Sequence, residues 1–252
     1  MTGPLAGRSV LVTRPEHQAA RLAEAIRAAG GEAVEFPALA IEAVPAVDLA
    51  APLAELARAD SVIFVSPNAA QFGLAAIGAL PPAAEVFAVG PGTARALREH
   101  GVTAHVPDGQ DSEALLAMPL LQDVAGRRVV IVRGVGGRPL LAETLRARGA
   151  TVHFLECYRR VCPATDAAPL RARWRAGGID AVTAASAETL VNLATLLGEA
   201  GRPLLVATPL FVPHEKIADA ARRFGMARVV ATAGGDAGLV EGLIHWFRNM
   251  HD

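Results

Sequence analysis

Residues 129–138 read VVIVRGVGGR, an apolar run followed by a glycine-rich segment. The run has the composition of a strand buried on both faces, and the glycines permit a tight turn. Pro139 then begins a helical pattern in which Leu141 and Leu145 share a face, and Gly149 ends it. A buried strand, a turn and an amphipathic helix form the repeating unit of a parallel sheet covered by helices. The stretch therefore predicts an α/β fold.

The same pattern occurs near the N-terminus, where residues 10–18 read VLVTRPEHQ. Arg14 corresponds to Arg133 at an offset of 119 residues, and Ser66 corresponds to Ser186 at an offset of 120. Further along the chain the offset grows to 124. Small increases of this kind are what loop insertions into a duplicated unit produce. We therefore expect two homologous halves and two flavodoxin-like parallel-sheet domains, which disfavours a single barrel.

Each half is predicted to contain five strands, which are short apolar runs separated by helical patterns. The predicted strands are 10–13, 33–36, 62–65, 86–89 and 104–106 in the first half, and 129–132, 152–155, 181–184, 210–212 and 228–231 in the second. Two proline-containing stretches, 38–48 and 159–169, are the expected connections between domains. Two crossings are compatible with simple succession of the domains or with an exchange of pieces between them, and periodicity does not choose.

Composition excludes several classes of protein. The chain has 252 residues, 52% of them hydrophobic and 19% charged, so it can bury a core and is not disordered. A formal net charge of −1 gives no electrostatic footprint for nucleic acid. Two cysteines in this length are no disulfide framework. The N-terminus resembles no signal peptide, and the longest charge-free run, 61–84, contains Gly and Pro residues. We expect a soluble, cytoplasmic protein with no nucleic-acid or membrane partner.

Basic residues flank the glycine-rich turn. Arg133 and Arg138 could each bind a carboxylate or phosphate through two hydrogen bonds, and the N-terminus of the following helix offers free N–H groups. Arg14 occupies the same strand end in the first half. The other interpretation is a tight turn with solvated arginines. Neither G-x-G-x-x-G nor G-x-x-x-x-G-K-[ST] occurs, so nucleotide binding is not indicated.

Hydroxyl groups follow other predicted strands. Ser66 and Ser186 could cap the following helices or bind a ligand, and Thr93 follows the glycine-rich turn after residues 86–89. Tyr158, the only tyrosine, lies just after a strand, where a phenol can donate a proton. Because ligands bind at the carboxyl ends of strands in open parallel sheets, we expect these groups to lie along that edge of each domain.

The sequence gives little support for a metal site or for a reactive cysteine. His214 begins a predicted helix, but the sequence HEKIA lacks the second histidine of the zinc-protease motif, so a buried or capping histidine is the alternative. Cys157 and Cys162 have no His or Cys at metal-ligand spacing, and we interpret them as inert thiols.

Five segments in order resemble the uroporphyrinogen-III synthase family. They contain VTRPE, FVSPN, VGPGTA, VRGVGGR with ECYRR, and FVPHEK, and they lie in residues 10–41, 62–74, 86–102, 129–160 and 211–243. The resemblance implies two flavodoxin-like domains joined by two strands. It places residues 1–37 with 163–252 in a discontinuous domain and 44–158 in the other. The interdomain connections are then 38–43 and 159–162.

The resemblance also implies an activity. The family acts without a cofactor or a metal ion on hydroxymethylbilane, a linear tetrapyrrole with eight carboxylates, bound between the domains. It promotes loss of the terminal hydroxyl and closes the macrocycle with inversion of the last ring. A monomer is expected. The rival hypothesis is a non-catalytic small-molecule-binding or regulatory protein on the same two-domain fold.

Site residues follow from the same resemblance. Tyr158 matches a tyrosine near the cleft and is the candidate proton donor. The candidate substrate-binding residues are Arg14, Ser66, Asn68, Thr93, Arg133, Gly134, Gly136, Gly137, Arg138, Ser186, His214 and Thr232. Two positions depart from the family pattern. Ala185 lacks an expected hydroxyl. Gly235 stands where many members have threonine, so that hydroxyl is missing unless Thr232 supplies it.

Overall fold

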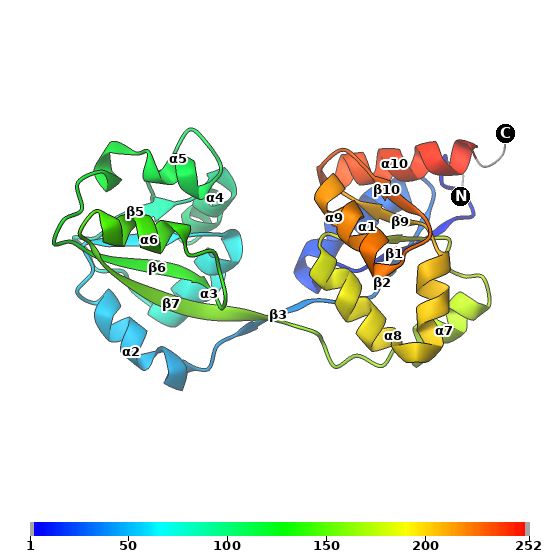
Figure 1. The fold of residues 1–252 in the computed structure, drawn as a ribbon, viewed down its shortest axis with the longest axis horizontal. Helices are drawn as coiled ribbons and strands as arrows, with labels where there is room; N and C mark the ends of the chain where they lie inside the picture. Colours follow the sequence, from blue (N-terminus) through cyan, green and yellow to red (C-terminus); the bar gives the residue numbers. More distant parts are fainter. Residues whose placement is uncertain (1–2, 250–252) are drawn as a thin grey trace. The chain divides into compact units, whose positions relative to one another are not determined.

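The computed structural model describes residues 3–249, and the chain divides into two compact units. The first unit contains the chain up to Ala40 and from Val161 onward, and the second contains Ile41–Arg160. Each unit is an α/β layer structure in which helices cover a central sheet, as the labelled ribbon in Figure 1 shows. The prediction of an α/β fold with two parallel sheets is confirmed.

The first unit holds a five-stranded parallel sheet in the order β10-β9-β8-β1-β2. Numbered along the unit, this is the flavodoxin order 2-1-3-4-5. The strands are β1 (Ser9–Val12), β2 (Glu32–Glu35), β8 (Ala181–Thr183), β9 (Leu210–Val212) and β10 (Val229–Ala231). The helices are α1 (Glu16–Ala28), α7 (Ala168–Arg175), α8 (Ala187–Ala207), α9 (Glu215–Phe224) and α10 (Gly235–Asn249).

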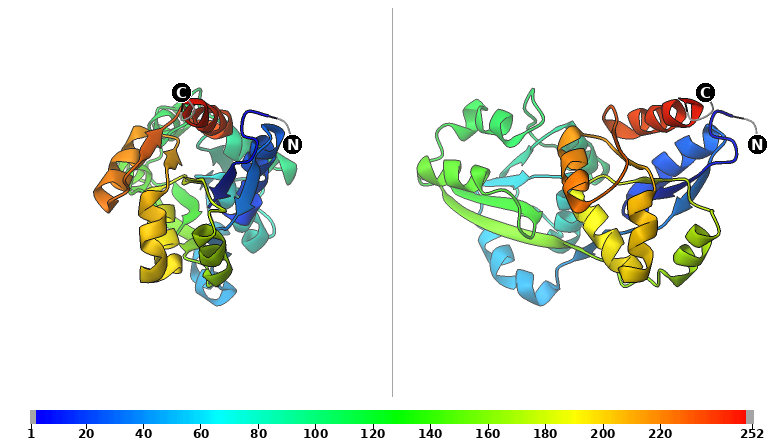
Figure 2. Two further views of the ribbon diagram at one scale, coloured as in Figure 1. Left: turned by 90° about the vertical axis from the view of Figure 1, so that its right-hand side faces the viewer. Right: turned by 45° about the vertical axis from the view of Figure 1, so that its right-hand side comes forward.

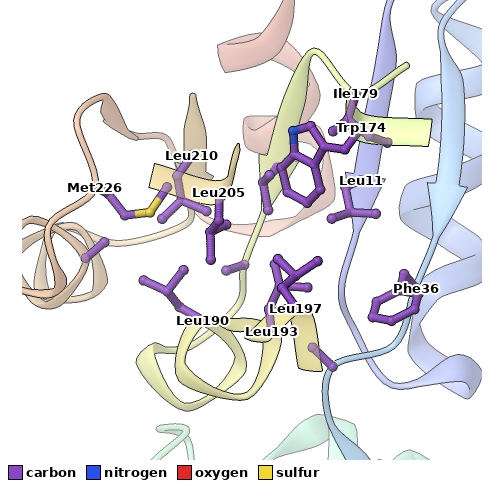
Figure 3. Packing of buried hydrophobic residues seen from close by; sticks show 14 of the residues in the cluster. Leu11, Phe36, Trp174, Ile179, Leu190, Leu193, Leu197, Leu205, Leu210 and Met226 are labelled. Carbon is purple, nitrogen blue, oxygen red and sulfur yellow. The ribbon is translucent and has the colours of Figure 1, made fainter. Parts of the chain in front are cut away.

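Helices pack on both faces of this sheet because alternate strand residues point to opposite sides. Val10 and Val12 face α1 and α10, which lie side by side in Figure 2. Leu11 faces the other way, into a cluster with residues of α7 and α8 such as Trp174 and Leu193 (Figure 3). The indole nitrogen of Trp174 is satisfied, since it donates to Thr208 Oγ1 at 3.0 Å. A strand with both faces buried reads as a continuous apolar run, as the sequence does.

The second unit has its sheet in the order β3-β7-β6-β4-β5. The strands are β3 (Ala40–Ala43), β4 (Ser61–Phe64), β5 (Glu85–Ala88), β6 (Arg128–Gly134) and β7 (Thr151–Val161). The helices are α2 (Ala46–Leu56), α3 (Pro67–Ile77), α4 (Pro91–Glu99), α5 (Ser112–Leu116) and α6 (Leu140–Ala147), with a 3₁₀ turn η1 (Pro119–Leu121). Four strands, β7-β6-β4-β5, repeat the order of β2-β1-β8-β9 in the first unit, whereas β3 lies at the opposite edge, beside β7.

The strand registers test the internal repeat. In the first unit Val10 of β1 is paired with Ala33 of β2. In the second unit Val129 of β6 is paired with Val152 of β7. Both members of the second pair lie 119 residues after their counterparts in the first, so the two pairs coincide when one half is laid on the other. Register is specified residue by residue in a sheet with buried faces, and this agreement confirms that the halves are equivalent.

Pairing between the halves follows the same rule. Val10 of β1 is paired with Ala181 of β8, and Val129 of β6 is paired with Ser61 of β4. These two pairs are also equivalent under the repeat. In both units, therefore, a strand of the first half lies beside a strand of the second. The halves have exchanged pieces, which is one of the two arrangements that the sequence left open.

One strand predicted from the apolar pattern is absent, and one strand was not marked by that pattern. Residues 104–106 form no strand, because His105 makes only an isolated bridge to Phe87 and Pro107, which has no N–H, ends the pairing. The second unit has a further strand, β3, at the other edge of its sheet; it lies in the 38–43 connection, where the family resemblance implied a strand and the apolar pattern did not. It is held beside β7, where the amide of Val44 donates to the carbonyl of Cys157 at 3.0 Å.

Among the described helices, α8 is long and apolar enough by length and composition to cross a membrane. It is not a continuous helix. Gly198 has φ 63° and ψ −175° and separates two shorter helices. Leu190, Leu193 and Leu197 of the first helix are buried in the core of the first unit. Core packing therefore accounts for the buried leucines of α8, whereas other apolar residues of this segment, such as Val191, are exposed.

Candidate functional site

A cavity of about 430 Å³ opens at the carboxyl edge of the sheet in the second unit. Ends of β4, β5 and β6 form its floor, and the start of α6 and the loop before α5 form its walls. It is lined by Val65, Val89, Gln110, Asp111, Ser112, Ile131, Arg133, Gly137, Arg138 and Leu141. Apolar side chains from the strands and polar groups from the loops are the usual composition of a small-molecule site. Arg133, Gly137 and Arg138 were predicted to belong to it, whereas residues 110–112 were not.

Arg133 is a buried charge at this edge, since only 7% of the residue is exposed. Its guanidinium donates to the carbonyl oxygens of Gly137 at 2.9 Å, Gly134 at 3.3 Å and Arg138 at 3.4 Å. It also forms an ion pair with Glu156 at 3.2 Å. The side chain predicted to bind a substrate carboxylate therefore holds the glycine-rich loop in shape.

The surroundings of Arg133 explain the loop sequence. Its Cζ lies 4.4 Å from the centre of the Phe154 ring, a cation–π arrangement. A Cβ on Gly137 would lie 3.1 Å from the guanidinium, so this position favours glycine. Gly136 has φ 77°, which side chains rarely adopt. The sequence does not predict that Glu156 and Phe154 contact Arg133, because a strand pattern does not mark which residue faces an arginine on the neighbouring strand.

Arg138 is the cation that remains for a ligand at this edge. Its side chain is exposed, and it has no ion pair within residues 3–249. It lines the cavity together with Asp111, whose carboxylate is occupied by the amide of Ala114 at 2.8 Å. An arginine with unused donors beside an apolar floor can bind a carboxylate attached to a flat apolar ring.

Tyr158 and Ser66 come together at the same edge. The Tyr158 hydroxyl lies 3.1 Å from Ser66 Oγ, and Ser66 Oγ accepts from the amide of Ala69 at 3.0 Å. Ser66 is thus the N-cap of α3, one of the two roles that the sequence allowed. Tyr158 is buried, with 4% of the residue exposed, and its ring packs on Phe72 with centroids 5.7 Å apart. The candidate proton donor therefore has a fixed orientation.

Asn68 and Thr93 begin the helices on that edge. Asn68 is in the first turn of α3 and half-buried, and Thr93 is in the first turn of α4 with 4% of the residue exposed. Neither side chain hydrogen-bonds to another group in the part of the chain that the structure describes. Both are therefore able to bind a polar ligand group, as the sequence predicts.

The first unit presents a different set of groups. Arg14 follows β1, as Arg133 continues β6, and its guanidinium is paired with Asp236 of α10 at 2.5 Å. Ser186 caps α8 by accepting from the amide of Thr189 at 3.1 Å. The Thr232 hydroxyl donates to the carbonyls of Ala233 at 3.0 Å and Val212 at 3.3 Å.

His214 and Ala185 complete the predicted set in the first unit. His214 is the N-cap residue of α9, but its ring caps nothing and is exposed. It is not the buried or capping histidine offered as the alternative, and the exposed ring can bind a ligand. Ala185 is exposed before Ser186, so the hydroxyl missing from the family pattern is absent from an accessible position.

The chemistry of the cysteines is settled by burial. Cys157 is 1% exposed, and burial raises the pKa of its thiol to about 12. Cys162 is exposed and unbridged. Across residues 3–249, no three His, Cys, Asp or Glu side chains gather closely enough to hold a metal ion.

Two parallel sheets of flavodoxin order, with hydroxyls and guanidiniums at their carboxyl edges, define a two-unit α/β protein of the ligand-binding type. The sequence model of the family described as uroporphyrinogen-III synthase HemD matches residues 20–241. The chain belongs to the uroporphyrinogen-III synthase family.

Relatives with that name align over most of the chain. It is 38% identical to a uroporphyrinogen-III synthase of Salmonella typhimurium over 239 residues, which is 91% of this chain and 97% of the relative. It is 36% identical to that of Escherichia coli over 243 residues, with the same coverage of each chain. Nearly the whole length of each relative is therefore represented here.

Solved structures agree on the fold. A mutant uroporphyrinogen III synthase from Thermus thermophilus has a TM-score of 0.62 at 22% identity, covering 97% of this chain and 99% of that one. A synthetase from Helicobacter pylori has a TM-score of 0.60 at 11% identity, covering 96% and 99%. At these identities the likeness concerns the fold alone.

Proposed function

We propose that this chain converts hydroxymethylbilane to uroporphyrinogen III, closing the macrocycle with inversion of the terminal pyrrole ring and loss of water. The observation that carries the proposal is the family match over residues 20–241, together with relatives of that name aligned over 91% of the chain. The protein is then a cyclising lyase of tetrapyrrole biosynthesis. The rival binding or regulatory protein is not favoured, since the relatives that align over most of the chain are named uroporphyrinogen-III synthase.

The first chemical step needs one proton donor. The Tyr158 phenol gives its proton to the terminal hydroxyl, the C–O bond breaks, and water leaves as the pyrrole nitrogen lone pair forms an azafulvenium ion. The phenolate then takes the pyrrole N–H proton, which leaves a neutral azafulvene and restores the phenol. No oxidant or reductant is required, since the net change is loss of water. A phenol is a suitable general acid when its geometry is fixed, as the packing of Tyr158 against Phe72 supports.

The protein must also bind the carboxylates of the substrate. Arg138 and the polar groups of the cavity suit one pyrrole ring with its acidic side chains. Asn68 and Thr93 offer further unused polar groups, and His214 does so in the first unit, where Thr232 can only accept because its hydroxyl hydrogen is donated to backbone carbonyls. Spontaneous closure gives the uninverted isomer, so these contacts act by positioning the chain for ring inversion. A cytoplasmic location and a monomeric state belong to the same proposal.

Product analysis with purified protein tests the function. Hydroxymethylbilane, made enzymatically in the assay, should be converted to the III isomer. The wild-type protein should form this isomer faster than spontaneous closure forms the I isomer. A binding protein would leave the I isomer as the product, and that result would overturn the proposal.

The Tyr158→Phe variant tests the proton donor separately. It keeps the ring that packs on Phe72 and removes the hydroxyl. Because a general acid contributes about 10²–10⁴-fold, we expect kcat to fall by at least about 100-fold while the remaining product stays the III isomer. A turnover near that of wild type would exclude Tyr158 as the acid while leaving the family activity in place.

A further inference from the structure

We infer that Ser66 is a positioning residue for Tyr158. The Ser66 hydroxyl donates its proton to the phenol oxygen of Tyr158, so that the phenol proton is free for the substrate. The resemblance placed Ser66 among the substrate-binding residues, and the hydrogen bonds assign it a different partner. The inference rests on the proposed function, because the phenol proton is the one that the reaction consumes.

The hydrogen-bonding capacity of Ser66 permits the direction that we infer. A hydroxyl has one donor and two acceptor sites. Ser66 Oγ accepts from the Ala69 amide at 3.0 Å, so one acceptor site is occupied by the cap. Tyr158 Oη lies 3.1 Å from Ser66 Oγ, a contact in which either oxygen can donate, and in the arrangement that we infer the Ser66 hydrogen is the one donated. With the hydrogen placed there, the Tyr158 proton points away from Ser66 and is available to a third group.

The ring of Tyr158 has little freedom to turn away from this contact. Gly134 lies against it, since a Cβ on Gly134 would be 2.6 Å from Cε2 and Cζ of the ring. Phe72 packs on the ring, and the carbonyl of Tyr158 accepts from the Val135 amide at 2.9 Å. Backbone and ring are both fixed, so Ser66 sets the direction of the phenol O–H bond.

Ser66 also has an electrostatic role once the proton has left. A hydroxyl that donates to an oxyanion favours the charged form. Ser66 in turn accepts from the first turn of α3, an 11-residue helix whose N-terminus carries partial positive charge. The chain of donors from the Ala69 amide through Ser66 to Tyr158 therefore stabilises the phenolate that forms when water departs.

The internal repeat supplies a comparison inside the same molecule. Ser186, the counterpart of Ser66, accepts from the Thr189 amide at 3.1 Å, and its hydroxyl lies 2.9 Å from Thr189 Oγ1. Both serines cap a helix, but only Ser66 faces an ionisable group, since Leu39 stands at the position equivalent to Tyr158. Helix capping is thus common to Ser66 and Ser186, whereas only Ser66 contacts a phenol.

A double-mutant cycle tests the inference in the full-length protein. We expect Ser66→Ala to lower kcat by about 10-fold or more with KM changed less than about 3-fold, because the acid and not the binding is affected. Ser66→Thr keeps both the cap and the donor and should restore kcat to within about 3-fold of wild type. In the Tyr158→Phe background, Ser66→Ala should change kcat by less than about 2-fold, because its partner is already gone.

Three outcomes would overturn the inference. Ser66→Ala lowering kcat by the same factor with and without the Tyr158 hydroxyl would show that it does not act through Tyr158. A raised KM with unchanged kcat would show that Ser66 binds substrate. A fully active Tyr158→Phe enzyme would remove the group that Ser66 is inferred to position, whereas a wild-type protein that forms no III isomer would refute the proposed function itself.

Loss of the helix cap is controlled by the matched serine. Ser66→Ala and Ser186→Ala each remove one N-cap hydroxyl, and each should lower Tm by a few degrees. A Ser66→Ala protein no less stable than Ser186→Ala, with the kcat loss described, separates the effect on catalysis from that on folding. If kcat recovers when Ser66→Ala is assayed well below its Tm, the loss was due to unfolding and the inference fails.

Discussion

At the scale of a single residue, Cys157 shows how burial changes the acidity of a thiol. Its sulfur faces the carbonyls of Arg133 at 3.6 Å and Ala69 at 3.9 Å. Burial raises the pKa of the thiol to about 12, from an ordinary value of 9.0. A thiolate in this apolar position would lose its hydration without gaining a charged partner.

The raised pKa of Cys157 predicts a pH dependence of stability. The thiol ionises at about pH 9 in the unfolded chain and at about 12 in the folded one. Its contribution is therefore complete below pH 9 and falls by about 1.4 kcal/mol per pH unit as the pH rises from 9 towards 12. We expect the stability difference between wild type and Cys157→Ala, measured by urea unfolding from pH 8 to 10.5, to shrink at that rate. Parallel curves for the two proteins would contradict this.

Arg133 marks what the sequence could and could not predict about the site. A basic residue at a strand end beside glycines was expected to bind a ligand, and in the structure Arg133 lines a cavity of the second unit. Its hydrogen bonds, however, go to the loop carbonyls, because an arginine that is 7% exposed must satisfy its donors within the protein. Strand patterns locate a residue at an edge, whereas its partners depend on which neighbours the sheet brings close.

At the scale of elements, most boundaries follow from local rules. Strands buried on both faces and helices begun by Pro and ended by Gly were predicted within a few residues, as β6 and α6 show. Apolar patterning does not mark β3, because its residues are no more apolar than a connection and half of them are exposed; the family resemblance alone implied a strand in 38–43. It is a strand only because β7 extends far enough to offer it a partner. Pairing of this kind depends on tertiary context and not on propensity.

Gly198 gives a prediction for α8. Its φ of 63° and ψ of −175° belong to a region that is nearly restricted to glycine. Space is not the obstacle, since a Cβ there would meet nothing within 4 Å. Gly198→Ala should therefore lower the free energy of unfolding by about 1–3 kcal/mol through backbone strain alone, measured by urea denaturation. Glu199→Ala, on the adjacent exposed residue, is the control and should stay within about 0.5 kcal/mol of wild type. Equal stability of the two variants would show that the kink relaxes.

The whole molecule combines features that sequence periodicity predicts with one that it leaves open. The repeat offsets predicted two equivalent halves, and the register of Val10 with Ala33 and of Val129 with Val152 bears them out. The exchange of pieces between the halves was beyond periodicity, since an equivalent sheet forms whether β1 is paired with a strand of its own half or of the other. That choice depends on the lengths of the two connections, which only the folded chain shows.

The exchange has a consequence for folding that is specific to this topology. Each hydrophobic cluster draws its residues from one unit, and the clusters of the second unit lie wholly within Ile41–Arg160. This unit is continuous in sequence, whereas the first unit needs β1 and β2 from one end of the chain and β8, β9 and β10 from the other. The two units should therefore respond differently when the chain is cut.

A fragment of residues 41–160 should fold alone, because its sheet and both clusters are complete. We expect a single cooperative thermal transition with an enthalpy of about 80 kcal/mol near 60 °C, and equal calorimetric and van't Hoff values. The matched fragment 161–252 should remain unfolded, since β1 lies between β8 and β2 in the sheet and is missing from it. A non-cooperative 41–160 fragment that binds a hydrophobic dye would show that this unit requires the other to fold. Cooperative folding of 161–252 would show that the central position of β1 is dispensable.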